Sequence, residues 1–119
     1  MPPRECATIL VVEKNAAVLE LIDQVLRESG HRVLSTNDAL EAIEVAGRVE
    51  IDVVVSGVLV EVRTLVSQLR SIQPDVHIIV CNPGDEREAI DRTTTLSTPL
   101  SLSDLREAVA ASIGHRSAR

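Results

Sequence analysis

The chain has 119 residues and a mass of 12.9 kDa, the size of one ordinary domain. Its composition, 45% apolar and 25% charged, is that of a globular protein and excludes disordered or fibrous classes. The formal charge of −6 and the absence of Phe, Trp and Tyr disfavour direct binding to nucleic acid or to anionic membranes. The sequence shows neither an apolar run of the ~20 residues that span a bilayer nor a signal peptide, so we expect a cytoplasmic protein.

Several short runs rich in β-branched residues predict strands. The runs 9–12, 53–55 and 76–81 are continuously apolar, which is typical of parallel strands buried on both faces. The segment 31–36 predicts another strand, and the threonine-rich segment 93–97 predicts an edge strand before Pro99.

Helices are predicted between these strands, because apolar residues recur there at helical spacing. The predicted helices are 18–26, 39–46, 62–69 and 102–113, with a short one over 84–91. Predicted caps are Asn37 or Asp38 and Ser101 at helix starts, and Gly30, Gly47 and Gly114 at helix ends.

Alternating strands and helices predict an α/β fold, a three-layer α/β/α sandwich around a five-stranded parallel sheet. We expect one domain over 1–119, with a core over 6–114 and a tail or the start of a linker over 115–119. Ligands of such sheets bind at the carboxyl ends of the strands. The residues expected there are Glu13, Lys14, Gly57, Asn82 and Thr98.

The pattern resembles the receiver domain of bacterial two-component response regulators. Residues 9–13 resemble the family's first strand, which normally ends in an acidic pair that holds a divalent metal; the pair here is Glu13-Lys14. Residues 52–57 resemble the third strand, whose last residue is normally the phosphoacceptor aspartate; Gly57 stands there. The resemblance implies a flavodoxin-like sheet of order 2-1-3-4-5.

The other family positions also differ. Residues 78–82 are similar to the fourth strand, where Asn82 replaces the usual Thr or Ser. Residues 97–100 are similar to the Lys-Pro-Phe corner, with Thr98 in place of the lysine, and the aromatic switch residue would fall near Thr95. The segments after Gly57 and after Asn82 are shorter than in the family, so the usual partner surface is predicted to be rebuilt.

Phosphoryl transfer to an aspartate requires a carboxylate nucleophile, a hard cation held by oxygen ligands and a fixed ammonium group. The positions of this chain that match the family's site supply none of these three groups. The sequence therefore predicts a degenerate receiver, or pseudo-receiver, that is not an enzyme and uses no metal or other cofactor.

Three functional hypotheses remain. The first is a receiver-like module of a two-component or phosphorelay system that is not phosphorylated and acts through protein contacts. Its partner would be a histidine kinase, a response regulator, an output protein or a second copy. The alternatives are a phosphoacceptor that uses an unusual residue and a sensor whose small-molecule ligand binds near Gly57.

Other reactive residues have plain structural interpretations. Cys6 and Cys81 are expected as reduced thiols at opposite ends of the sheet. The three histidines lack metal-binding spacing. Glu13 is expected to pair with Lys14, and Ser56 to point to the face opposite position 57.

Overall fold

Five strands form one parallel sheet in the computed structural model, which describes residues 7–57, 62–82, 93–97 and 101–117. The strand order is β2-β1-β3-β4-β5. The strands are β1 (Thr8–Val12), β2 (Arg32–Thr36), β3 (Val53–Ser56), β4 (His77–Asn82) and β5 (Thr93–Ser97). The predicted fold class and strand order are confirmed.

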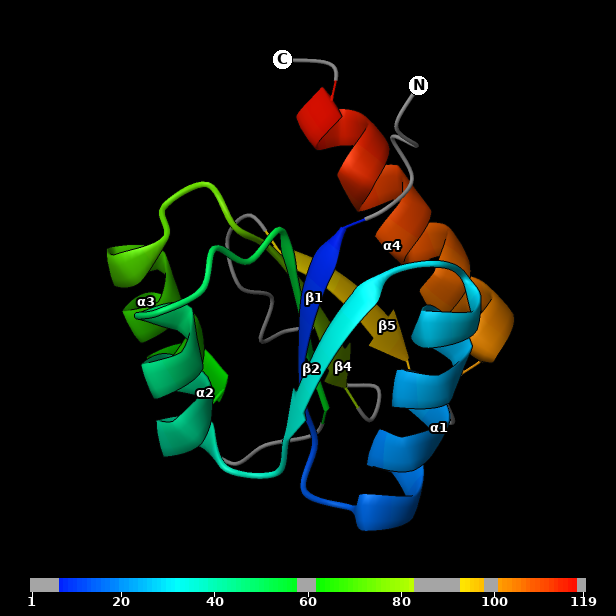
Figure 1. Cartoon of the computed structure of the whole chain (residues 1–119), viewed down its shortest axis with the longest axis horizontal. Coiled ribbons are helices and arrows are strands. Elements are labelled where there is room, and N and C mark those ends of the chain that lie inside the picture. The colour runs from blue at the N-terminus through cyan, green and yellow to red at the C-terminus, as the bar shows by residue number, and fades with distance from the viewer. Residues whose placement is uncertain (1–6, 58–61, 83–92, 98–100, 118–119) are drawn as a thin grey trace.

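Helices cover both faces of this sheet. They are α1 (Ala16–Glu28), α2 (Ala39–Ala46), α3 (Val62–Ile72) and α4 (Leu102–Ser117). Figure 1 shows α2 and α3 on one side of the sheet and α1 and α4 on the other. β1 begins and α4 ends at the amino edge of the sheet, and the carboxyl edge lies at the bottom of the view. None of the helices in the described part is long and apolar enough to cross a membrane.

The core is divided by the sheet into two apolar layers, which explains the continuously apolar strands. Alternate residues of one strand face opposite layers: Ile9 and Val11 pack towards α1 and α4, whereas Leu10 and Val12 pack towards α2 and α3. All four side chains are fully buried. Aliphatic side chains fill both layers without any aromatic ring.

The helix ends follow the sequence in most places. Asn15 and Asp38 cap α1 and α2 with their side chains, and the Ser101 hydroxyl accepts from the Asp104 N–H at the start of α4. Gly30 has a φ of 95°, a left-handed conformation that suits glycine after α1.

One predicted helix end is wrong. Helix α4 does not stop at Gly114 but continues to Ser117, so residues 115–117 of the predicted tail are helical. A glycine can adopt helical angles at a cost of about 1 kcal/mol, so it weakens a helix without having to end it. The short helix predicted over 84–91 lies outside the described residues.

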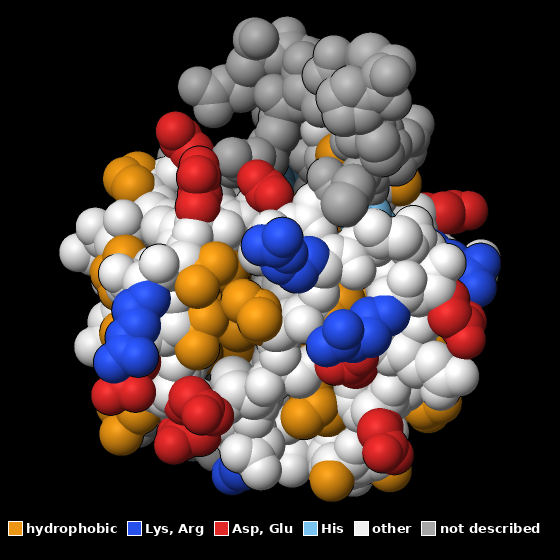
Figure 2. Space-filling view, in the orientation of Figure 1, with side chains coloured by type: hydrophobic (Ala, Val, Ile, Leu, Met, Phe, Trp, Pro, Cys, Tyr) orange, Lys and Arg blue, Asp and Glu red, His pale blue; other side chains and the backbone are white. Residues whose placement is uncertain are grey.

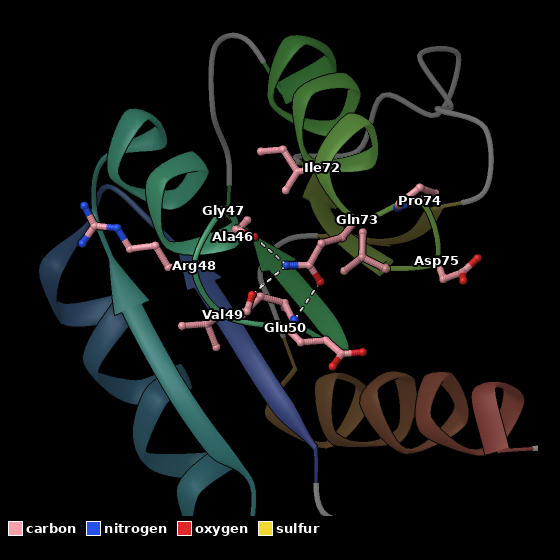
Figure 3. Close-up of a pocket in the computed structure, with 11 residues that line it drawn as sticks. Ala46, Gly47, Arg48, Val49, Glu50, Ile72, Gln73, Pro74 and Asp75 are labelled. Atoms are coloured by element: carbon pink, nitrogen blue, oxygen red, sulfur yellow. Dashed lines mark hydrogen bonds between the residues drawn. The ribbon is translucent and has the colours of Figure 1, made fainter.

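A cavity of about 400 Å³ lies at the amino ends of β3 and β4, between the segments that follow α2 and α3. Gln73 points into the turn after α2 (Figure 3) and uses its whole amide there. Its Nε2 donates to the carbonyls of Ala46 and Val49 at 2.8 and 2.7 Å, and its Oε1 accepts from the Ile51 N–H at 2.7 Å. The amide therefore fixes the entry into β3.

Replacing Gln73 with alanine is expected to destabilise the fold by about 1–3 kcal/mol, because partly buried backbone groups lose their partners. Chemical denaturation followed by circular dichroism measures the loss. The exposed Gln68→Ala on α3 is the matched control and should change stability by less than about 0.5 kcal/mol. Equal stability of the two variants would show that Gln73 does not hold the turn.

Candidate functional site

The carboxyl ends of β1 and β3 bring Glu13 and Gly57 side by side. Val12 is the register partner of Ser56, and the Gly57 N–H donates to the Val12 carbonyl at 2.7 Å. On the other side of β1, the Glu13 N–H donates to the Thr36 carbonyl of β2 at 3.0 Å. Glu13 is thus fixed between its two neighbouring strands, at the edge where ligands of such sheets bind.

The side chain of Glu13 turns inward and covers Gly57. It is only 8% exposed. A Cβ atom added to Gly57 would lie 1.6 Å from Oε1, 2.5 Å from Cδ and 3.3 Å from Oε2 of Glu13, and these are its three nearest atoms. The carboxylate therefore occupies the space into which a side chain at position 57 would project.

The first turn of α1 holds this carboxylate. The Asn15 N–H donates to Oε2 of Glu13 at 3.0 Å. The Asn15 side chain accepts from the N–H groups of Ala17 and Val18 at 3.0 and 3.1 Å. The N-cap residue Asn15 thus joins the Glu13 carboxylate, through its backbone N–H, to the start of α1, through its side chain.

Cys81 lies on β4, close enough to Glu13 to feel its charge. The thiol is free and buried, with 4% exposure. Burial, and to a smaller extent the negative charge of Glu13, raise the pKa of Cys81 to about 11. Since the thiolate is the reactive form, this thiol is poorly suited to redox chemistry near neutral pH. Cys6 lies outside the described residues.

The ion pair expected between Glu13 and Lys14 is not formed. Glu13 is buried, whereas Lys14 is exposed to solvent. Consecutive residues at a strand end point in opposite directions, which separates the two side chains. The group that faces position 57 is therefore the Glu13 carboxylate.

The neighbours of Gly57 on β3 have structural partners. The Ser56 hydroxyl is fully buried and donates to the Gly57 carbonyl at 3.2 Å. Asp52 lies at the opposite end of the strand, where its carboxylate accepts from the Thr8 N–H at 2.9 Å.

The remaining predicted positions are described only in part. Asn82 and Thr95 belong to β4 and β5, where their register partners are Ser97 and Val80. Their side chains, and the whole of Thr98, lie outside the described residues. The structure thus brings Glu13 and Gly57 together and leaves the other half of the predicted site undescribed.

The described residues do not fit the divalent metal that the resemblance would imply. Hard cations such as Mg²⁺ are bound by several oxygen ligands. Among the described residues, the carboxylate that faces position 57 is that of Glu13; one of its oxygens accepts from a backbone N–H, and Gly57 offers no side chain. Within the described ranges, His, Cys, Asp and Glu side chains form no group of three that could hold a metal ion.

The comparisons with known proteins resolve the fold. No family model and no curated protein matches the chain. Among solved structures, a response regulator receiver domain protein from Clostridium thermocellum superposes with a TM-score of 0.83 at 23% identity, covering 93% of this chain and 97% of that one. The chain has the fold of a response regulator receiver domain.

Receiver domains of sensor kinases show the same likeness. The receiver domain of the hybrid histidine kinase CckA gives a TM-score of 0.76 at 26% identity, over 89% of this chain and 98% of that one. The receiver domain of a sensor histidine kinase from Pseudomonas aeruginosa PAO1 has magnesium coordinated in its active-site cleft. It gives a TM-score of 0.78 at 23% identity, over 91% of this chain and 98% of that one. The receiver fold is therefore common to proteins that hold the metal and to this chain, whose described residues do not suit it.

Sequence reasoning missed the inward orientation of Glu13. The signal available was a pairwise one: a glutamate, one methylene longer than aspartate, follows a central strand, and a glycine follows the strand beside it. Considered separately, Glu13 is interpreted as an exposed acidic residue and Gly57 as a position without a functional side chain.

We expect the Cys81 thiol to react slowly in the folded protein. In a Cys6→Ser background at pH 8, alkylation by iodoacetamide should be at least about a hundredfold slower than in urea, because the pKa near 11 lowers the thiolate fraction and burial blocks access. Mass spectrometry of quenched samples gives both rates. Equal rates in buffer and in urea would contradict the buried position of Cys81.

Proposed function

We propose that this chain is a receiver-like module of a two-component or phosphorelay system that signals through protein contacts without accepting a phosphoryl group. The receiver fold supports the general role. The site supports the second part, since position 57 offers no nucleophile. We also propose that the module acts in the cytoplasm and needs no cofactor.

One observation carries the proposal. The space above Gly57, where an acceptor side chain would lie, holds the carboxylate of Glu13. Phosphoryl transfer depends on positioning and on positive groups that neutralise the developing charge on the phosphoryl oxygens. Here the incoming group would meet a fixed negative charge instead, with Lys14 exposed to solvent.

A small-molecule sensor is less well supported. The space that a missing side chain would leave at Gly57 is filled by Glu13. The cavity of about 400 Å³ lies at the opposite edge of the sheet. A wider cavity of about 960 Å³ runs along the solvent-facing side of α1, lined by residues such as Glu20 and Asp23. Neither cavity is lined by Glu13 or Gly57.

A thiol-based redox role is also less well supported. One similar structure is from a family of redox sensors in the streptococci that evolved from two-component response regulators. It has a TM-score of 0.81 at 18% identity, and the match covers 93% of this chain but 52% of that one. The raised pKa of Cys81 works against such chemistry at this thiol.

The exposed surface is consistent with transient protein contacts. On the face shown in Figure 2, hydrophobic side chains lie in small groups among acidic and basic ones. The large apolar side chains that are exposed in the described part, Leu21, Leu40 and Ile72, belong to three different helices. Such a mixed surface is typical of non-obligate interfaces. A kinase, a response regulator, an output protein or a second copy are the partners that we propose.

Incubation with acetyl phosphate and magnesium is expected to leave the intact mass unchanged, because neither a free acceptor carboxylate nor a metal site is available at position 57. A phosphorylatable receiver domain in the same reaction is the positive control, and circular dichroism checks folding. A stoichiometric gain of one phosphoryl group on the folded wild-type chain would refute the proposal.

A further inference from the structure

We propose that Glu13 is an internal plug: its carboxylate takes the place of the side chain that position 57 lacks and holds the carboxyl edge of the sheet closed without phosphoryl group, metal or ligand. The inference rests on the proposed function and adds how the site is kept in one state. It makes Glu13 and Gly57 a coupled pair, because the buried position of Glu13 requires a glycine at 57.

The first step concerns volume. An added Cβ at position 57 would lie 1.6 Å from Oε1 of Glu13, well inside the separation of any two unbonded atoms. Even alanine at 57 therefore forces the Glu13 side chain to leave its position. Aspartate, which is larger, would do the same.

The second step shows that the backbone does not require glycine here. Among the described glycines, Gly30 has a positive φ and Gly57 does not. Residues with a side chain can therefore adopt the backbone conformation of Gly57. A glycine without a backbone reason usually makes room for a close neighbour. At Gly57 that neighbour is the Glu13 carboxylate.

The third step explains why Glu13 stays inside. Its carboxylate is buried next to the start of α1 and accepts the Asn15 N–H. A buried charge is costly unless it is hydrogen-bonded, and this bond lies at the helix end that favours a negative charge. Expelling Glu13 would therefore leave the Asn15 N–H without this partner.

The fourth step gives the consequence for signalling. A plug that belongs to the chain cannot dissociate, so the first turn of α1 and the ends of β1 and β3 keep one arrangement. A partner that contacts these three segments would meet them in that one arrangement.

The test is a double-mutant cycle on the full chain: wild type, Gly57→Ala, Glu13→Ala and the double variant, compared by thermal unfolding. Gly57→Ala should lower the Tm more in the wild-type background, where the Glu13 carboxylate must leave the Asn15 N–H, than in the Glu13→Ala background, where nothing has to move. Gly47→Ala is the matched control, because its added Cβ would lie 3.5 Å from the nearest atom, an ordinary contact. Its Tm should stay within about 2 °C of wild type.

The thiol of Cys81 supplies a second readout that does not depend on stability. In a Cys6→Ser background, Glu13→Ala removes the negative charge that helps to raise the pKa of Cys81, so native-state alkylation of Cys81 should become several-fold faster. Gly57→Ala should have the same effect by displacing Glu13, and Gly47→Ala should have none. Should Gly57→Ala fail to fold, Glu13→Ala still decides this readout, because it adds no atoms.

The plug is refuted if the double variant loses as much stability as the sum of the two single variants, or if Cys81 labelling is unchanged by Glu13→Ala. None of these measurements contains a phosphoryl donor. Phosphorylation of the wild-type chain would instead overturn the proposed function, so the two failures are distinguishable.

Discussion

The Glu13 carboxylate and any side chain at position 57 compete for one volume at the carboxyl edge of the sheet. The sheet imposes this competition, because the pairing of Val12 with Ser56 places the next residues of β1 and β3 side by side. With Glu13 in this orientation, no side chain fits at position 57. In this chain the acid comes from β1, and β3 contributes a glycine.

Other features of the site follow from that arrangement. The N–H of Asn15 binds the carboxylate while its side chain caps α1, so one residue joins the plug to the helix. The charge of Glu13 adds to burial in raising the pKa of Cys81 on β4. Lys14, next in the chain, remains in solvent. The family chemistry needs a nucleophile at position 57, and the space for its side chain is taken by the Glu13 carboxylate.

The sequence predicted the fold well because its signals are local. Runs such as 53–55 could pack only as doubly buried strands, and Asp38 and Gly30 mark helix ends by their own chemistry. The helix end predicted at Gly114 was wrong, because a glycine weakens a helix without having to end it, and α4 continues to Ser117. The site residues were found by position, but the direction of Glu13 depends on a residue more than forty positions away. A contact of that kind cannot be read from either residue alone.

The most direct test of the central claim is a pair of crystal structures, of the wild-type chain and of Gly57→Ala. We predict that Glu13 in the wild type lies over Gly57 with its carboxylate on the Asn15 N–H, and that in the variant it has swung out of the site while the sheet is unchanged. A wild-type structure with Glu13 in solvent and open space above Gly57, or a variant with Glu13 still in place, would contradict the account.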